Sequence, residues 1–246
     1  MEVTEVMDMP VHRVPAFTDN YIWLFEYAPG LVAVVDPADA APVLAAVREK
    51  RLRITHILNT HWHPDHVGGN LAIKEASGCT IIGPRQEEAK IPGIDRAVDE
   101  GDRVMLGSHS GAVYFVGAHT AGHIAFHFPS AGALFPGDTL FAMGCGRLFE
   151  GSAADMFAAL GKLKALPADT RVYCAHEYTL SNARFAVTVE PGNAALAARY
   201  AAVQVARSNA LPTVPFALSE ELATNPFVRA SSIEELAARR SAKDAF

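Results

Sequence analysis

The 246-residue sequence has few cysteines and no excess of positive charge. Its cysteines are Cys79, Cys145 and Cys174, an odd number without paired spacing, which argues against a disulfide framework and favours a reducing compartment. Aspartate and glutamate outnumber lysine and arginine, 27 to 21, for a formal net charge of −6. Because proteins that follow nucleic-acid phosphates usually carry a basic excess, no nucleic-acid partner is expected.

Long hydrophobic runs and a recognisable targeting signal are also missing. The apolar stretches fall well short of the ~18 residues that suggest a membrane span. Met1 to Met9 alternates acidic and apolar residues, and it resembles neither a secretory signal nor an Arg-rich transit peptide. We therefore expect a cytoplasmic protein with no membrane association.

Half of the residues are hydrophobic and a fifth are charged, as in an ordinary globular protein long enough to bury a full core. Apolar and β-branched runs alternate with helical composition, which predicts a layered α/β sandwich over residues 1–180. Beyond about Ser181 no strand-like run is seen, and a helical domain over 181–246 is expected. The predicted strands are 21–25, 31–35 (a hairpin with 21–25), 54–58, 80–82, 113–116, 124–128, 133–135 and 171–174, and the predicted helices are 41–50, 70–76, 153–166, 194–208 and 232–242.

A cluster of metal-ligand residue types follows the predicted strand 54–58. His61 and His63 are two positions apart, so both can face one metal where the backbone is extended. Asp65 and His66, in the turn into the next helix, can face a second metal. Imidazole nitrogen with carboxylate oxygen suits zinc, iron or manganese.

This segment supplies too few ligands for two catalytic metals, which usually have three protein ligands each. His119, Asp138 and His176 each follow a predicted strand and are candidates for the rest. Taken alone, any of these three is more often an ordinary polar residue, and the preceding cluster is what makes them candidates. The remaining histidines are not expected to be ligands, although His123 is a candidate partner of one: His12, His56, His109, His123 and His127.

The string Thr60-His-Trp-His-Pro-Asp-His-Val-Gly-Gly69 resembles the signature of the metallo-β-lactamase superfamily. Later segments resemble those of the glyoxalase II family, the hydroxyacylglutathione hydrolases. The resemblance extends from about Pro15 to Arg229. The segments that carry it are 18–21, 118–123, 135–141, 144–151, 174–179 and 225–229.

The resemblance implies an αββα sandwich with a C-terminal α-helical domain that binds substrate. It also implies two divalent metal ions, zinc by preference, with iron or manganese as alternatives. The implied ligands are His61, His63 and His119 for one metal, Asp65, His66 and His176 for the other, and Asp138 as the bridge. All seven positions are filled without substitution.

The implied substrate contacts are Arg147, Phe149, Tyr178 and Arg229. Arg147 and Phe149 stand where many relatives have Lys and Tyr, so a phenolic hydrogen bond is lost. The segment 230–233 also lacks a lysine that some relatives place after the arginine, and weaker or altered glutathione binding is therefore expected. For Arg229, a solvated surface charge is the alternative interpretation.

The implied reaction is hydrolysis of S-(2-hydroxyacyl)glutathione, such as S-D-lactoylglutathione, to glutathione and D-lactate in methylglyoxal detoxification. A thiol leaving group with a pKa near ~8.5 needs little acid assistance, so the requirement is a metal-bridging hydroxide oriented by Asp65. The expected partner is a small glutathione thioester, and the expected state is a monomer.

Other enzymes of the superfamily remain as alternatives, namely a lactonase, a β-lactamase-like hydrolase or a persulfide dioxygenase with a single iron. The complete second ligand set of Asp65, His66 and His176 disfavours the mononuclear oxygenase. A non-enzymatic metal-binding module on the same fold is a further alternative, against which the complete ligand set argues.

Overall fold

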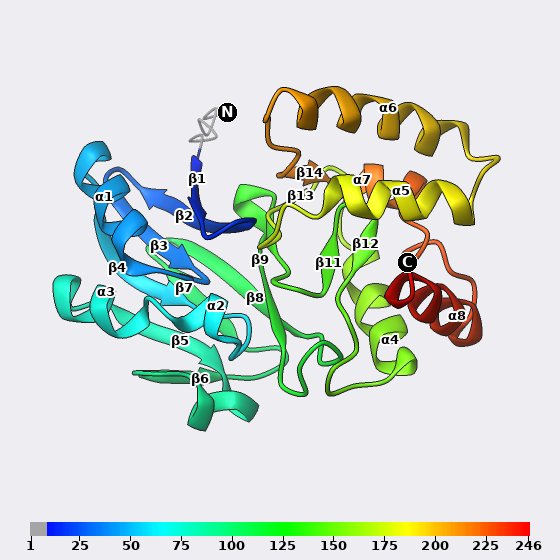
Figure 1. Cartoon of the computed structure of the whole chain (residues 1–246). Coiled ribbons are helices and arrows are strands. Elements are labelled where there is room, and N and C mark those ends of the chain that lie inside the picture. Colours follow the sequence, from blue (N-terminus) through cyan, green and yellow to red (C-terminus); the bar gives the residue numbers. More distant parts are fainter. Residues whose placement is uncertain (1–8) are drawn as a thin grey trace, which may run out of the picture.

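Two six-stranded sheets face each other in the computed structural model, which describes residues 9–246 (Figure 1). The expectation for Met1 to Met9 therefore lies almost entirely outside the described residues. The first sheet has the order β1-β2-β3-β4-β5-β6 and the second has the order β14-β13-β10-β9-β8-β7. A two-stranded sheet of β11 and β12 lies apart from both.

The first sheet begins antiparallel and continues parallel from β3 onward. In the second sheet, β10 and β13 are parallel and the other pairs are antiparallel. The strands are β1 Val11–Ala16, β2 Asn20–Ala28, β3 Leu31–Val35, β4 Arg53–Leu58, β5 Thr80–Pro84, β6 Arg96–Val98, β7 Arg103–Leu106, β8 His109–Phe115, β9 Ile124–Phe128, β10 Ala133–Phe135, β11 Leu140–Phe141, β12 Gly144–Cys145, β13 Arg171–Val172 and β14 Phe216–Ala217.

The five predicted helices are present, and α2, α5 and α7 are additional. α1 begins after Asp39, whose carboxylate accepts the N–H of Ala41, and α3 ends at Gly78, which adopts a left-handed conformation. The helices are α1 Ala40–Lys50, α2 Pro64–Val67, α3 Asn70–Ser77, α4 Ala153–Lys164, α5 Thr179–Val189, α6 Ala194–Ser208, α7 Leu218–Thr224 and α8 Ile233–Asp244, with 3₁₀ helices η1 Arg85–Lys90 and η2 Pro129–Ala131.

The main core lies between the two sheets. Trp23 and Phe25 of β2 pack in one cluster with Phe126 and Phe128 of β9 and Phe135 of β10. The Phe25 ring lies 4.9 Å from that of Phe128, centroid to centroid. A second cluster joins the other face of the first sheet to α1 and α3, and α4 packs against the main core. The predicted αββα sandwich is confirmed.

The C-terminal part is mainly helical, as predicted, and its helices lie together at one end of the molecule (Figure 1). One expectation is wrong, because β14 pairs with β13 and so adds a strand from beyond Ser181 to the second sheet. The predicted strand 171–174 is also shorter, and β13 is only Arg171–Val172. Between residues 9 and 246, no helix has the length and apolar character to cross a membrane.

Candidate metal centre and substrate cavity

All seven predicted ligands lie in segments that follow strands. His61 and His63 follow β4, and Pro64 begins the short helix α2 that carries Asp65 and His66. The other three come from the second sheet, His119 after β8, Asp138 after β10 and His176 after β13. The structure gathers them into three overlapping groups with ligand atoms within 4.8 Å of one another: His61, His63 and His119; His61, His66 and Asp138; Asp65, His66 and His176.

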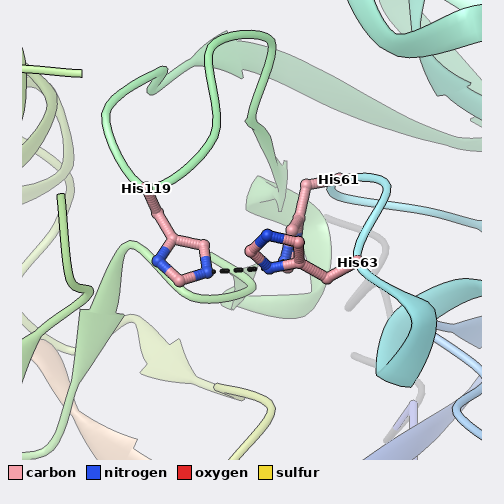
Figure 2. Close-up of side chains that lie close together, drawn as sticks. All are labelled: His61, His63 and His119. Atoms are coloured by element: carbon pink, nitrogen blue, oxygen red, sulfur yellow. Dashed lines mark hydrogen bonds between the residues drawn. The ribbon is translucent and has the colours of Figure 1, made fainter. Parts of the chain in front are cut away.

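Three imidazole rings converge in the first group (Figure 2). The Nδ1 atom of His63 lies 3.1 Å from Nε2 of His61 and 3.1 Å from Nε2 of His119. Nδ1–H of His119 donates to the carbonyl oxygen of Arg147 at 2.9 Å, so Nε2 of the neutral ring carries a lone pair.

The same reasoning settles the tautomer of His61. Its Nδ1 lies 3.0 Å from the Thr60 hydroxyl, which already donates its hydrogen to Asp36 at 2.7 Å. Nδ1 of His61 is therefore the donor, and its Nε2 also presents a lone pair to the group. Converging nitrogen lone pairs at this spacing fit a shared cation.

The group of Asp65, His66 and His176, called the second group from here on, combines a carboxylate with two more imidazoles and lies beside Asp138. Nδ1–H of His176 donates to Asp19 at 2.9 Å, which turns Nε2 toward Asp65 and Asp138, 3.4 Å from an oxygen of each. Nδ1 of His66 lies 3.1 Å from Asp36 without hydrogen-bond geometry. Neither ring nitrogen of His66 has a hydrogen-bond partner among the described residues, although both are buried.

Asp138 faces both groups. Its Oδ2 lies 3.4 Å from Nε2 of His119, while its Oδ1 lies 3.4 Å from Nε2 of both His66 and His176. Oδ1 is buried and has no hydrogen-bond partner in the described part of the chain. Since such an orphaned oxygen is costly in the absence of a cation, this geometry fits a carboxylate shared between two metals.

The electrostatics favour metal binding by the first group and Asp138, whereas Asp138 and the other nearby carboxylates raise the pKa of His66 and His176 although burial alone would lower it. Burial and the neighbouring imidazoles lower the pKa of His61 well below its usual value, and burial also lowers the pKa of His63 and His119. Burial alone would raise the pKa of Asp138, but His176 and His66 hold it well below its usual range. These residues therefore offer neutral imidazoles and an ionised carboxylate, and the chain has the donors of a divalent-metal site.

A cavity of about 790 Å³ opens beside this centre. Arg147, Phe149 and Tyr178 line it, as the predicted substrate contacts require. The Phe149 ring lies 5.2 Å from that of His119, and the Tyr178 ring stacks on His176 at 4.7 Å. Arg229 does not line the cavity, because its guanidinium pairs with Glu190 at 3.0 Å. The alternative interpretation of Arg229 as a surface charge agrees better with this position.

Four residues near the site were not singled out in the sequence as site residues. Arg240 and Lys243 of α8 line the cavity, where Arg240 donates to the carbonyl oxygen of Cys145 at 2.8 Å. Asp19 orients His176, and Asn20 donates to Asp65 at 3.1 Å. Asp19 and Asn20 lie within the motif Thr18-Asp-Asn-Tyr21, which was a usable signal, whereas Arg240 and Lys243 follow the last of the motifs quoted for the family resemblance.

His123 supports the centre as expected. Its Nδ1–H donates to the carbonyl oxygen of Ile124 at 3.0 Å, and its Nε2 accepts the backbone N–H of Asp138 at 3.1 Å. The ring also stacks on His61 with 4.4 Å between centroids. The hydrogen bond therefore holds the segment that carries the shared carboxylate.

Comparison with known proteins places the chain in a family. The profile of the metallo-β-lactamase superfamily matches residues 17–176, and that of the hydroxyacylglutathione hydrolase C-terminus matches residues 177–246. The hydroxyacylglutathione hydrolase of Methylococcus capsulatus is 54% identical over 227 residues, which are 92% of this chain and 89% of that protein. The chain belongs to the hydroxyacylglutathione hydrolase family. Another hydroxyacylglutathione hydrolase, from Erythrobacter litoralis, is 46% identical and covers 97% of this chain and all of its own length.

Solved structures confirm the fold of this hydroxyacylglutathione hydrolase family member. The ETHE1 protein of Myxococcus xanthus superposes with a TM-score of 0.72 at 24% identity, covering 95% of this chain and 90% of its own. The BLEG-1 B3 metallo-β-lactamase superposes with a TM-score of 0.69 at 18% identity, covering 90% of this chain and all of its own. At these identities the likeness concerns the fold alone.

Proposed function

We propose that this protein is a thioester hydrolase that cleaves S-(2-hydroxyacyl)glutathione, with S-D-lactoylglutathione as the expected substrate. Family membership at about 50% identity supports the reaction class. The observation that carries the proposal is the position of Asp138, whose two oxygens face two separate ligand groups beside a cavity with basic residues. A carboxylate shared in this way is the centre of a binuclear hydrolase.

The proposed metal ligands are His61, His63 and His119 for one ion, Asp65, His66 and His176 for the other, and Asp138 between them. Zinc is the proposed metal, because three imidazoles with carboxylate oxygens suit it, and iron or manganese are accepted by the same donors. When bound, two such ions would lower the pKa of water to about 7 and polarise the thioester carbonyl.

The chain's own side chains would orient the reacting groups. Asp65 is anchored by Asn20 at 3.1 Å and lies beside His176, and these contacts hold its pKa well below its usual range although burial alone would raise it. Its ionised carboxylate can accept a hydrogen bond from the attacking water and so aim it. Asp65 is the proposed catalytic residue in addition to being a ligand.

The glutathione part of the substrate is proposed to lie along the basic side of the cavity. Arg147, Arg240 and Lys243 offer cations for its carboxylates, while Phe149 and Tyr178 offer aromatic faces. Arg229 remains a predicted substrate contact, although it pairs with Glu190 and does not line this cavity, and Arg240 and Lys243 are proposed in addition because they do line it.

Residues 1–180 would supply the metal centre and residues 181–246 the helical substrate-binding part. α5 begins at Thr179, so this boundary falls near the start of that helix. Three free, buried cysteines support a cytoplasmic location, since reducing conditions favour free thiols. A monomer is the proposed state, and light scattering on the purified protein checks it.

Steady-state kinetics on S-D-lactoylglutathione, a lactone and a β-lactam test the function, with metal content measured on the same sample. We expect turnover of the thioester to far exceed that of the other substrates, at two metal ions per chain. Preference for the lactone or β-lactam would contradict the proposed substrate. A single bound iron with oxygen consumption would instead support a persulfide dioxygenase.

A further inference from the structure

Glu87 is a buried carboxylate on η1 whose position needs an explanation. Its side chain is only 2% exposed, and no lysine or arginine within residues 9–246 forms an ion pair with it. Instead, Oε2 accepts the backbone N–H of Trp62 at 2.9 Å, and Oε1 accepts the backbone N–H of Gly122 at 2.9 Å. Both oxygens are thus used by backbone groups of two other segments.

These two backbone groups belong to the loops that carry the first ligand group. Trp62 lies between His61 and His63, and Gly122 lies three residues after His119 in the turn before β9. The close approach requires glycine, because a Cβ at Gly122 would lie 2.6 Å from Cγ of Glu87. A single side chain therefore links the loop from the first sheet to the loop from the second.

As a purely structural link, Glu87 would reduce the stability of the fold. Burying a carboxylate without a cation costs free energy, which two backbone hydrogen bonds offset only in part. Burial accordingly raises the pKa of Glu87, although the N–H groups of Gly122 and Trp62 act to lower it. What the carboxylate provides is a further link between two loops that also meet through the contact of His63 with His119 and through the backbone hydrogen bond from Ile124 to Thr60.

We propose that Glu87 is a positioning residue that fixes the loop of His61 and His63 relative to the loop of His119 and thereby raises the metal affinity of this ligand group. The inference rests on the proposed metal ligands. Groups that orient metal ligands without touching the metal typically change affinity by about 10- to 100-fold when they are removed. Glu87 forms no hydrogen bond with Asp65, His66 or His176, and it links the segment of His61 and His63 to that of His119, so its effect is expected mainly on the first group.

Zinc affinity measured by chelator competition in two backgrounds tests this. His176→Asn leaves the first group intact, and His119→Asn leaves Asp65, His66 and His176 intact. Glu87→Gln keeps the side-chain volume but turns an amide N–H₂ toward one of the two backbone N–H donors. We expect it to weaken zinc binding about 10- to 100-fold in the His176→Asn background and to leave affinity in the His119→Asn background unchanged.

Glu88→Gln, an exposed change on the same helix, is the matched control and is expected to alter neither affinity. The visible spectrum of bound Co²⁺ gives a second readout, and we expect its ligand-field bands to shift only with Glu87→Gln. Gly122→Ala tests the link from the other side and is expected to cause the same selective loss, since its methyl group would displace Glu87.

Equal losses in both backgrounds, or none in either, would overturn the proposal. So would failure of both Glu87→Gln and Gly122→Ala to fold without metal, judged by circular dichroism, because Glu87 would then be a folding residue. If the two backgrounds bind no zinc even with Glu87 present, the ligand assignment fails and the proposal fails with it. Normal binding there with an unaffected Glu87→Gln variant refutes the role of Glu87 alone.

Discussion

At the scale of single residues, Asp138 connects the two ligand groups. Replacing it by alanine removes the carboxylate shared between His119 on one side and His66 with His176 on the other. We expect Asp138→Ala to lose at least one metal ion per chain and to reduce thioester turnover more than about 100-fold. Elemental analysis and thioester absorbance measure the two effects.

Asp138→Asn is the shape-matched comparison, because it keeps one oxygen but not the charge. We expect it to retain more metal than Asp138→Ala while remaining poorly active. Normal metal content together with intact activity in the alanine variant would exclude the bridging role.

His127 on β9 gives a prediction for stability against pH. It is buried, and burial lowers its pKa below the usual value. Below about pH 6.5 His127 therefore binds a proton in the unfolded chain more readily than in the folded chain. The contribution of this residue to stability is complete above that pH and decreases on acidification. We expect His127→Gln to flatten the loss of unfolding free energy between about pH 7 and pH 5. Urea denaturation at several pH values measures it, and parallel curves for the two proteins would contradict it.

The clustering of the candidate ligands in the first segment was predictable because its signal is local. His61, His63, Asp65 and His66 lie within six consecutive positions after one strand, and a strand end sets their direction. Asp19 contacts His176 and Glu87 contacts Trp62, and both contacts join segments far apart in the chain. The periodicity of a sequence does not reveal such contacts. The ion pair of Arg229 with Glu190 was not predictable for a related reason, since the two residues lie on different segments.

At the scale of elements, the β11–β12 hairpin is held by the C-terminal helices. Glu221 of α7 accepts the N–H of Met143 at 2.8 Å and pairs with Arg199 of α6 at 2.6 Å. Asn225 donates to the carbonyl oxygen of Gly144 at 2.9 Å. Phe141 and Cys145 of this hairpin line the cavity, so the C-terminal helices help to fix the position of this part of the cavity wall.

We expect Glu221→Gln to lower the free energy of unfolding by about 3 kcal/mol, because Arg199 would lose its buried ionic partner. Urea denaturation measures the loss. The double variant Glu221→Leu with Arg199→Leu should recover part of it, since no charge is then left unpaired. A Glu221→Gln protein as stable as its parent would show that the ion pair does not anchor the hairpin.

Several long elements were predicted well, whereas the helix α5, the strand β1 and the shortest strands were not. Ile124–Phe128 and Ala194–Ser208 have the bounds that their patterns predict. β11, β12 and β14 have two residues each, too few for an alternating pattern to appear. β14 also lies between helices, and only its pairing with β13 makes it a strand.

At the scale of the whole molecule, the charge distribution opposes the net charge. The chain has a formal charge of −6, yet the cavity is lined by the four cations Arg147, Arg184, Arg240 and Lys243 beside the three carboxylates Asp65, Asp138 and Asp244. A cluster of this kind attracts an anionic substrate at low salt and loses that effect as salt screens it.

We therefore expect kcat/KM for a glutathione thioester to fall as sodium chloride is raised, mainly through a higher KM. An uncharged thioester of the same acyl group is the control, and its kcat/KM should change little. The same salt dependence for both thioesters would place the effect on the protein and not on substrate attraction.

The pairing of β14 with β13 has a consequence for biosynthesis. β13 leads directly to His176, yet its neighbour on one side, Phe216–Ala217, leaves the ribosome only after α5 and α6 have been made. Until then β13 is an open edge, which invites pairing with other nascent chains. The second sheet is thus completed only late in synthesis, and a chain stalled before residue 216 would be a target for chaperones or degradation.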